Sequence, residues 1–338
     1  MTLLPYSKAL SFRGRRLFIT GGTGFLGRSL LDYLIESAKL HGAGFYVVVL
    51  TRNPVGFLQR FPEYANRHWL SFIEGDLQHL PLPIASYTDV VHAAADTHPS
   101  GSEPLAWLEQ LVDGTRRVLD YACSAGAQRM LLLSSGAVYG RQGFNQPSLQ
   151  EETLQAPSPT DTGSLYAHGK RMAETLCALY TSRRGLPCVI ARCFAVLSEH
   201  VPLNGPYAAG NFLRDALNPE RNQISVSGDG SAVRTYLDGR DLAHWTFTLL
   251  CHGEPGEAYN MGSDQTVTML ELAQRTADLI APGKLVVVER KVIDTVRSLY
   301  VPAIAKAQAI GLRVETSLDK AISKAGDGIA KRTLATVI

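Results

Sequence analysis

The sequence lacks a charge bias, paired cysteines and a long apolar segment. Its 33 basic and 31 acidic residues give a formal net charge of +2 and are mixed along the chain. We therefore expect no polyanion-binding stripe and no nucleic-acid partner. The five cysteines form no C-x-x-C pair and leave an odd one over, which is typical of a protein in a reducing compartment.

Targeting and membrane signals are also missing. The first 16 residues lack the apolar core of a signal peptide. No apolar run approaches the ~20 residues that a helix needs to cross a membrane. These absences predict a soluble, cytoplasmic protein without a membrane partner, and we expect no metal site.

The first half of the chain alternates two hydrophobic patterns. Segments with apolar residues three and four positions apart, such as Leu30, Leu31 and Leu34, predict helices. They alternate with short apolar runs, which predict strands buried on both faces. The runs cover residues 17–19, 45–50, 70–73, 90–92, 130–133 and 188–191. This alternation predicts an α/β fold with a doubly wound parallel sheet.

The pattern changes after about Phe194, where loop-forming residues become frequent and strands such as 223–228 are short. Thr268 and Glu271 form a T-x-x-E capping box, which predicts the start of a helix. We predict a dinucleotide-binding Rossmann domain over residues 1–193 that carries the catalytic residues. A smaller, mixed α/β substrate lobe is expected over residues 194–338.

A glycine-rich segment, ITGGTGFLG, follows the first predicted strand and opens the first predicted helix. Gly21 would allow the turn, Gly24 the approach of a phosphate, and Gly27 the packing of the helix on the sheet. The start of a helix offers backbone N–H groups and a partial positive charge. The predicted cofactor-binding loop therefore consists of Gly21, Thr23, Gly24, Phe25, Leu26 and Gly27.

The glycine spacing resembles the T-G-x-x-G-x-x-G of short-chain dehydrogenases/reductases, which implies a tyrosine and a lysine four residues apart downstream. Tyr166 and Lys170 meet this requirement. Positions i and i+4 share one helix face, so the ammonium would favour the phenolate, the form that accepts a proton. Ser135, at the end of a predicted strand, would hydrogen-bond the reacting oxygen. These three residues are the predicted catalytic set, and Tyr166 and Lys170 are also expected to contact the cofactor.

The segment S-S-x-x-V-Y-G, followed about 30 residues later by Y-x-x-x-K, resembles the extended branch of that superfamily. This branch comprises the NAD(P)-dependent nucleotide-sugar epimerases, dehydratases and reductases. The resemblance implies a nucleotide-diphosphate sugar as substrate and a homodimer. It implies cofactor contacts by Asp76, Leu77, Ala93, Ala94 and Ala95. The substrate contacts that it implies are Ser135, Gly136, Asn211 and Arg234.

Two positions depart from the family patterns. Dehydratases of this family carry Asp-Glu directly after the catalytic threonine. This chain has Gly136 and Ala137 at those positions. We therefore predict that the protein does not have 4,6-dehydratase activity. The second predicted strand ends in Thr51 and Arg52, where an NAD site would normally place an acid. An arginine there accommodates a 2′-phosphate, so we expect NADP, with NAD as the alternative.

Three functions remain open for the sequence. A reductase of 4-keto-6-deoxy nucleotide sugars is the first prediction, because Arg52 favours NADP. A nucleotide-sugar 4-epimerase that retains NAD shares the same catalytic residues. A non-catalytic NADP-binding sensor or scaffold would have no need of the Tyr166 phenol.

Overall fold

Two compact units make up the part of the chain that the computed structural model describes, which is residue 10 and residues 12–96, 103–289 and 298–337. Unit 1 consists of Met1–Ser134, His168–Ala191 and Ala243–Ala258. Unit 2 consists of Ser135–Ala167, Arg192–Leu242 and Tyr259–Ile338. The division of function at residue 193 stays a prediction.

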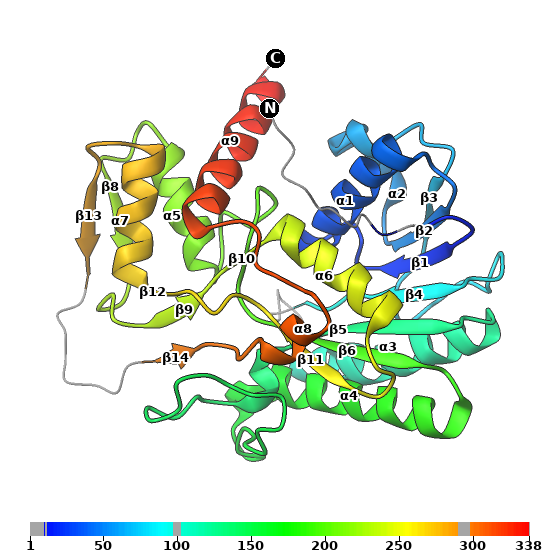
Figure 1. Ribbon diagram of the computed structural model, residues 1–338. Helices are drawn as coiled ribbons and strands as arrows, with labels where there is room; N and C mark the ends of the chain where they lie inside the picture. The colour runs from blue at the N-terminus through cyan, green and yellow to red at the C-terminus, as the bar shows by residue number, and fades with distance from the viewer. Residues whose placement is uncertain (1–9, 11, 97–102, 290–297, 338) are drawn as a thin grey trace. The chain divides into compact units, whose positions relative to one another are not determined.

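A seven-stranded sheet carries the glycine-rich segment (Figure 1). Its strands are β1 (Arg16–Thr20), β2 (Tyr46–Thr51), β3 (Leu70–Glu74), β4 (Asp89–His92), β5 (Arg129–Ser135), β6 (Cys188–Cys193) and β11 (Ala258–Met261). The order of the strands across the sheet is β11-β6-β5-β4-β1-β2-β3. The pairs β1–β2, β1–β4, β2–β3 and β4–β5 are all parallel. The strand order therefore reverses between β1 and β4, which is where such sheets bind ligands.

Helices cover both faces of this sheet in unit 1. They are α1 (Phe25–His41), α2 (Pro54–Arg60), α3 (Pro104–Ser124), α4 (Leu165–Arg184) and α6 (Gly239–His252), with a short 3-10 helix η1 (Pro62–Tyr64). On one face, Phe18 and Leu132 pack with Val118 of α3 and Cys177 of α4. On the other side lie α1 and α6, where Tyr33 stacks on Phe247 with 5.6 Å between ring centroids. The predicted doubly wound sheet is confirmed.

Unit 2 combines short strands with helices. Its strands are β7 (Val196–Leu197), β8 (Gln223–Val226), β9 (Val233–Thr235), β10 (Leu237–Asp238), β12 (Thr266–Thr268), β13 (Leu285–Val288) and β14 (Leu299–Tyr300). Its helices are η2 (Gly136–Tyr139), η3 (Thr162–Ser164), α5 (Ala208–Leu217), α7 (Met269–Ile280), α8 (Ala305–Ala309) and α9 (Leu318–Val337). β9 pairs antiparallel with β12 and parallel with β14, and α5 and α7 pack on the parallel pair β8–β13. This is the mixed α/β structure that the second half of the sequence predicts.

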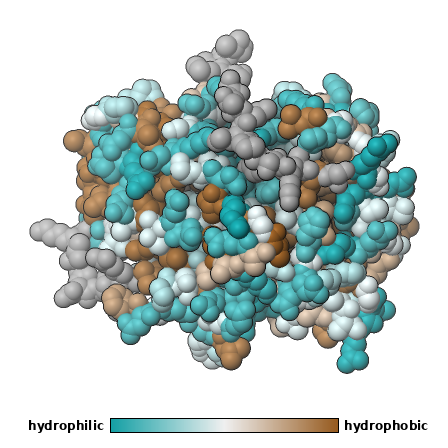
Figure 2. Space-filling model, viewed as in Figure 1, coloured by the Kyte–Doolittle hydropathy of each residue, from teal (hydrophilic) through white to brown (hydrophobic). Residues whose placement is uncertain are grey.

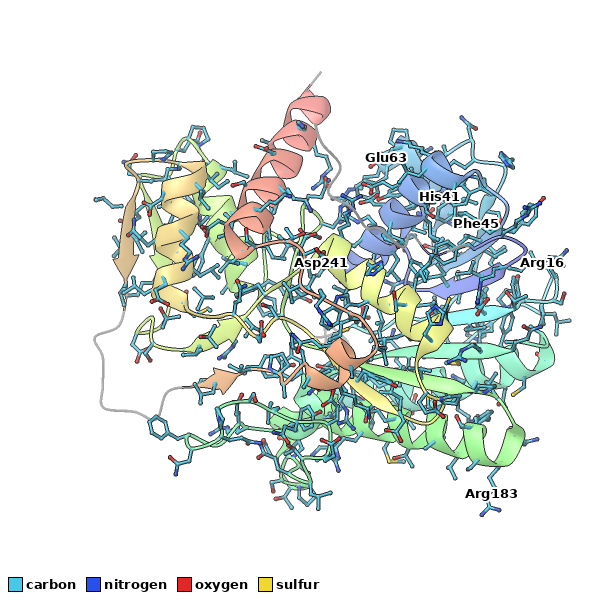
Figure 3. All side chains as sticks on the ribbon, in the orientation of Figure 1. Arg16, His41, Phe45, Glu63, Arg183 and Asp241 are labelled. Carbon is cyan, nitrogen blue, oxygen red and sulfur yellow. The ribbon has the colours of Figure 1, made fainter. Side chains whose placement is uncertain are left out.

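Two buried aspartates fix the C-terminal segment within unit 2. The carboxylate of Asp241, at the start of α6 (Figure 3), accepts hydrogen bonds from the amides of Glu315 at 3.0 Å and Thr316 at 2.9 Å. Asp238 pairs with Lys324 of α9 at 2.9 Å. Because a buried carboxylate is costly unless its oxygens are bonded, these partners stabilise both acids and hold α9 in place.

A helix that spans a membrane must be both long and apolar. None of the helices in the described residues has the length and hydropathy that a span requires. On the face shown in Figure 2, hydrophobic residues lie in small groups among hydrophilic ones. A cytoplasmic location stays a prediction.

The capping box at the start of α7 is confirmed. The Thr268 hydroxyl accepts from the amide of Glu271 at 3.1 Å, and the Glu271 carboxylate accepts from the amide of Thr268 at 2.8 Å. We expect Thr268→Ala to lower the free energy of unfolding by about 1 kcal/mol, since an amide at the helix start loses its partner. Urea denaturation measures this, and Thr268→Ser, which keeps the hydroxyl, is the control. Equal stability of the two variants would contradict the assignment.

Candidate active site

The glycine loop connects β1 to α1 through close backbone contacts. Gly21 has a φ of +72°, and a Cβ on it would lie 2.5 Å from the amide nitrogen of Ala94. A Cβ on Gly27 would lie 2.0 Å from the carbonyl oxygen of Gly21. Gly24 is exposed and lies directly before α1. Because glycine has no side chain, the amides at the start of this helix receive no side-chain cap from it. The start of α1 thus lacks a side-chain cap, and the binding of an anionic group there stays a prediction.

The end of β4, which supports this loop, is held by a buried histidine. His92 Nδ1 lies 2.7 Å from Thr20 Oγ1, and His92 Nε2 lies 3.2 Å from Thr115 Oγ1. Thr115 donates its own hydrogen to the carbonyl of Leu111, so Nε2 is the donor to Thr115 and Nδ1 accepts from Thr20. Burial, together with the Lys170 cation, lowers the pKa of His92 to about 3, which keeps the ring neutral.

The other predicted cofactor residues follow strands of the same sheet in unit 1. Ala93, Ala94 and Ala95 directly follow β4, and Thr51 ends β2 with its hydroxyl 3.2 Å from that of Thr23. The side chain of Arg52, the next residue, is exposed. Carboxyl ends of parallel strands meet at one edge of a sheet, so this group lies along the edge that binds dinucleotides in such folds.

Asp76 and Leu77 follow β3 and have different surroundings. The Asp76 carboxylate accepts from the amides of Gln78 at 2.8 Å and His79 at 2.6 Å. Partial burial works to raise the pKa of Asp76, but these hydrogen bonds outweigh it and lower the pKa. Leu77 is buried in the core against Gly114, where a Cβ would lie 3.0 Å from it. The Leu77 carbonyl accepts a hydrogen bond from Arg117 at 3.4 Å, and a contact of Leu77 with a cofactor stays a prediction.

Lys170 lies in unit 1 with a buried side chain. Its Nζ donates to the carbonyl of Leu133 at 2.8 Å, which ties α4 to β5. The neighbouring Ser134 donates to Glu174 at 2.6 Å and strengthens the same connection. Gly169 lets α4 approach α3, since a Cβ there would lie 2.6 Å from Leu111. The ammonium is therefore held in one position, four residues after Tyr166 on the same helix.

Unit 2 brings Ser135 and Tyr166 together. The Ser135 hydroxyl accepts from the amide of Ala137 at 3.1 Å and hydrogen-bonds the Tyr166 phenol. Burial is the largest influence on Tyr166 and raises its pKa, while the hydrogen bond with Ser135 lowers it. In the protein alone, Tyr166 is consequently a neutral phenol at physiological pH, ready to donate a proton.

Tyr300 is a neighbour of this pair that the sequence analysis missed. Its phenol also hydrogen-bonds Ser135, and its pKa is raised chiefly by burial. A Cβ on Gly136 would lie 2.6 Å from Tyr300 Oη and 2.7 Å from the ring of Phe194. No motif marks Tyr300, because it stands in a two-residue strand far along the chain.

The predicted substrate residues Arg234 and Asn211 also lie in unit 2. Arg234, on β9, donates to the carbonyls of Val233 at 2.8 Å and Ser298 at 2.9 Å, and to the Ser298 hydroxyl at 3.0 Å. Its burial lowers the pKa of the guanidinium. Asn211, on α5, donates to the carbonyl of Gly205 at 2.9 Å. These contacts orient both side chains, and their role in binding a diphosphate stays a prediction.

Comparisons with known proteins show the family and the fold of the chain. The model of the NAD dependent epimerase/dehydratase family matches residues 17–262. UDP-glucuronic acid decarboxylase 1 of Danio rerio is 29% identical over 280 residues, which cover 82% of this chain and 64% of that protein. The chain thus spans less than two thirds of the length of this relative.

Two further similarities bear on reaction and fold. The dTDP-D-glucose 4,6-dehydratase of Mus musculus is 27% identical over 274 residues, covering 79% of this chain and 73% of that protein. The structure of UDP-N-acetylglucosamine 4-epimerase from Methanobrevibacter ruminantium, in complex with UDP-N-acetylmuramic acid, has a TM-score of 0.80 and 20% identity. It covers 95% of this chain and 99% of that chain, and at this identity it shows the fold alone.

The exclusion of a 4,6-dehydratase is wrong. A 4,6-dehydratase is among the relatives that match most of the chain. The prediction depended on Gly136 and Ala137, which lack carboxyl groups. A second proton donor need not come from that loop, because any element that reaches the site can supply one, and in unit 2 the hydroxyl of Tyr300 lies beside Gly136.

The contact between Gly27 and Gly21 gives a direct test of the loop. In Gly27→Ala the new methyl group would collide with backbone, which cannot move aside as a side-chain tip could. We expect the free energy of unfolding to fall by about 1–3 kcal/mol and NAD(P) binding to be lost. Denaturation and fluorescence titration with NADH measure the two effects.

Gly143→Ala is the matched control, because nothing lies within 4 Å of a Cβ at Gly143. It should change the free energy of unfolding by less than about 0.5 kcal/mol. Cofactor binding that survives in Gly27→Ala would contradict the role assigned to this loop.

Proposed function

Because the chain belongs to the NAD dependent epimerase/dehydratase family, we propose that it transfers a hydride between NAD(P) and a ring carbon of a nucleotide-diphosphate sugar, at C4. The hydrogen bond between Ser135 and Tyr166 carries this proposal, with Lys170 four residues further on α4. A hydroxyl, a phenol and an ammonium in this relation can exchange one proton with a carbonyl or hydroxyl oxygen. A sensor without catalysis has no use for them.

The residues of unit 1 fit a dinucleotide. Gly21 and Gly27 let the backbone of the turn pack closely, since a Cβ on either would meet backbone atoms, and Gly24 leaves the helix start without a side-chain cap. Pyrophosphate oxygens would accept hydrogen bonds from the amides there. When bound, the nicotinamide accepts or supplies the hydride. Thr23, Phe25, Leu26, Thr51, Arg52, Asp76, Leu77, Ala93, Ala94 and Ala95 are the further proposed contacts.

Tyr166 handles the proton. In the oxidation of a ring alcohol, the carbon loses a hydride and the hydroxyl proton moves to the Tyr166 phenolate, leaving a ketone. Reduction is the reverse: the neutral phenol donates its proton as the carbonyl carbon gains the hydride. Since burial raises the pKa of Tyr166, the phenolate requires the Lys170 cation and the Ser135 hydrogen bond. Ser135 also bonds the substrate oxygen, on which negative charge develops.

The direction of the reaction and the cofactor form are the finer parts of the proposal. Arg52 and the missing acid after β2 favour NADPH, and with it the reduction of a 4-keto-6-deoxy nucleotide sugar. Epimerisation at C4 with retained NAD uses the same three residues. A nucleotide-diphosphate sugar fits Arg234 and Asn211 as diphosphate contacts, with Gly136 beside the sugar. A homodimer is proposed on the family resemblance alone.

Product analysis distinguishes these outcomes. The protein is incubated with NADPH and 4-keto-6-deoxy nucleotide sugars, and with NAD and UDP-glucose, UDP-glucuronic acid, UDP-N-acetylglucosamine or dTDP-glucose. NMR spectroscopy then identifies reduction, epimerisation, decarboxylation or loss of water. Stoichiometric oxidation of NADPH supports the reductase, and epimers without net cofactor change support the 4-epimerase. Absence of any product would contradict the proposed chemistry.

Tyr166→Phe tests the proton step. We expect turnover to fall about 100-fold or more, because the variant lacks the group that carries the proton. The dissociation constant for NADH should stay within about threefold, since the ring remains. Tyr46→Phe, which alters an exposed tyrosine on β2, is the control and should keep full turnover. Unchanged turnover in Tyr166→Phe would exclude the phenol as the acid or base.

Arg52→Ala tests the choice of cofactor. If Arg52 binds a 2′-phosphate, the KM for NADPH should rise about tenfold or more, while the KM for NADH changes less than about twofold. Arg60→Ala, which removes another exposed arginine of the same unit, should leave both constants unchanged. Equal changes for the two cofactors in Arg52→Ala would remove the reason for NADP.

A further inference from the structure

Tyr300 is fixed beside the candidate catalytic pair by elements of unit 2. It ends β14, where it pairs with Arg234 of β9. Its ring packs on Phe194 with 4.5 Å between centroids, and its hydroxyl lies 3.4 Å from the carbonyl oxygen of Cys193. The ring is thus held from one side by aromatic packing, and the hydroxyl has a backbone acceptor within reach.

Gly136 places this hydroxyl next to Ser135. A Cβ at Gly136 would lie 2.6 Å from Tyr300 Oη, closer than real Cβ atoms approach oxygen. The phenol therefore occupies the space that a side chain at position 136 would need. Glycine at this position and tyrosine at position 300 are two parts of one packing arrangement.

The Ser135 hydroxyl connects two phenols. It hydrogen-bonds Tyr166 and Tyr300, and its oxygen also accepts from the amide of Ala137. A serine hydroxyl has one hydrogen and two lone pairs. With one lone pair taken by Ala137, Ser135 can donate to one phenol and accept from the other, but it cannot donate to both.

Two directions of this hydrogen-bond chain are possible, and they correspond to the two states of Tyr166. When Tyr166 carries its proton, it donates to Ser135, Ser135 donates to Tyr300, and Tyr300 donates to the carbonyl of Cys193. When Tyr166 is a phenolate, Ser135 must donate to it. Tyr300 then turns its hydrogen from Cys193 to the oxygen of Ser135. Only O–H groups rotate, and no further proton is gained or lost.

We propose that Tyr300 is a positioning residue that sets the direction of the Ser135 hydroxyl and so stabilises the phenolate of Tyr166. This rests on the proposed function, in which Tyr166 exchanges a proton with the sugar. By donating to Ser135, Tyr300 makes the serine hydroxyl a better donor to the phenolate, because hydrogen bonds in a chain polarise one another. By turning to Cys193, it leaves the serine free to accept from the phenol.

Other titratable groups surround the two phenols, and Ser135 is the neighbour through which Tyr300 would support the phenolate. Cys193 of β6, Tyr207 before α5 and Tyr300 lie near Tyr166, and a negative charge on any of them raises the pKa of Tyr166, whereas the hydrogen bond with Ser135 lowers it. Arg234 and Tyr139 face Tyr300, and the Arg234 cation opposes part of the effect of burial on the pKa of Tyr300. On α4 itself, Lys170 follows Tyr166 by four residues.

Tyr300→Phe removes the hydroxyl and keeps the ring that packs on Phe194. The protein is labelled with [ζ-13C]tyrosine, and the Tyr166 signal is identified by its loss in Tyr166→Phe. We expect this signal to move in Tyr300→Phe and its change toward the phenolate to begin about 0.5–1 pH unit higher, because the phenolate loses support worth about one hydrogen bond. A Tyr166 signal that is the same as in the wild type at every pH overturns the proposal.

Tyr139→Phe is the matched control. Tyr139 belongs to the same aromatic cluster, but its hydroxyl donates to Asn260 at 2.8 Å and accepts from Arg192 at 2.8 Å. It should lower stability without moving the Tyr166 signal. Gly136→Ala is the second variant: its methyl group would displace the Tyr300 hydroxyl and should move the signal in the same direction. A shift of equal size in Tyr139→Phe would show a merely structural effect and overturn the proposal.

Kinetics separate this proposal from the proposed function. With a nucleotide sugar that the wild type converts, Tyr300→Phe should lower kcat about tenfold, leave KM within about twofold, and move the acid limb of the oxidation profile to higher pH. Unchanged kcat and an unchanged profile overturn the proposal. If the wild type converts no nucleotide sugar, the proposed function fails, while the NMR comparison still decides whether Tyr300 directs Ser135.

Discussion

The close approach of backbone to backbone at the start of α1 is the constraint on which the glycine loop of unit 1 depends. A Cβ on Gly27 would lie 2.0 Å from the carbonyl oxygen of Gly21, and one on Gly21 would lie 2.5 Å from the amide of Ala94. Without side chains at these positions, β1, the turn, α1 and the end of β4 form one rigid group. Gly24 is exposed and leaves the start of α1 without a side-chain cap, so an anion placed there would meet backbone amides.

Buried polar side chains hold the ends of the strands around this group. His92 joins Thr20 to Thr115 in the neutral state, because burial lowers its pKa to about 3. Lys170 donates a hydrogen bond to the carbonyl of Leu133, and this contact fixes the ammonium near the end of β5. Polar groups buried with their hydrogen bonds satisfied restrict the backbone to one arrangement, since every alternative leaves a donor or acceptor without a partner. The candidate catalytic residue Lys170 gains its fixed position from such a contact.

Local patterns in the sequence predicted much of the fold and part of the site. The glycine spacing, the i, i+4 spacing of Tyr166 and Lys170, and the capping box of Thr268 each lie within one element or one turn. Their geometry follows from helix and strand periodicity alone. The exclusion of a 4,6-dehydratase was wrong because it treated one loop as the whole supply of proton donors. Residues from distant segments meet in a folded site, and their spacing in the sequence carries no trace of it.

The sequence by itself determined the alternation of strands and helices, the glycine loop and the helix that carries Tyr166 and Lys170, since these depend on neighbouring residues and on backbone sterics. Only the tertiary structure decided which groups surround Ser135. Tyr300 reaches it because β14 pairs with β9 and packs on Phe194. The tertiary structure also shows that position 136 has no room for a side chain, because the Tyr300 hydroxyl and the Phe194 ring lie there. Pairing and packing between distant segments depend on the whole chain being folded, and this is why no local pattern predicted them.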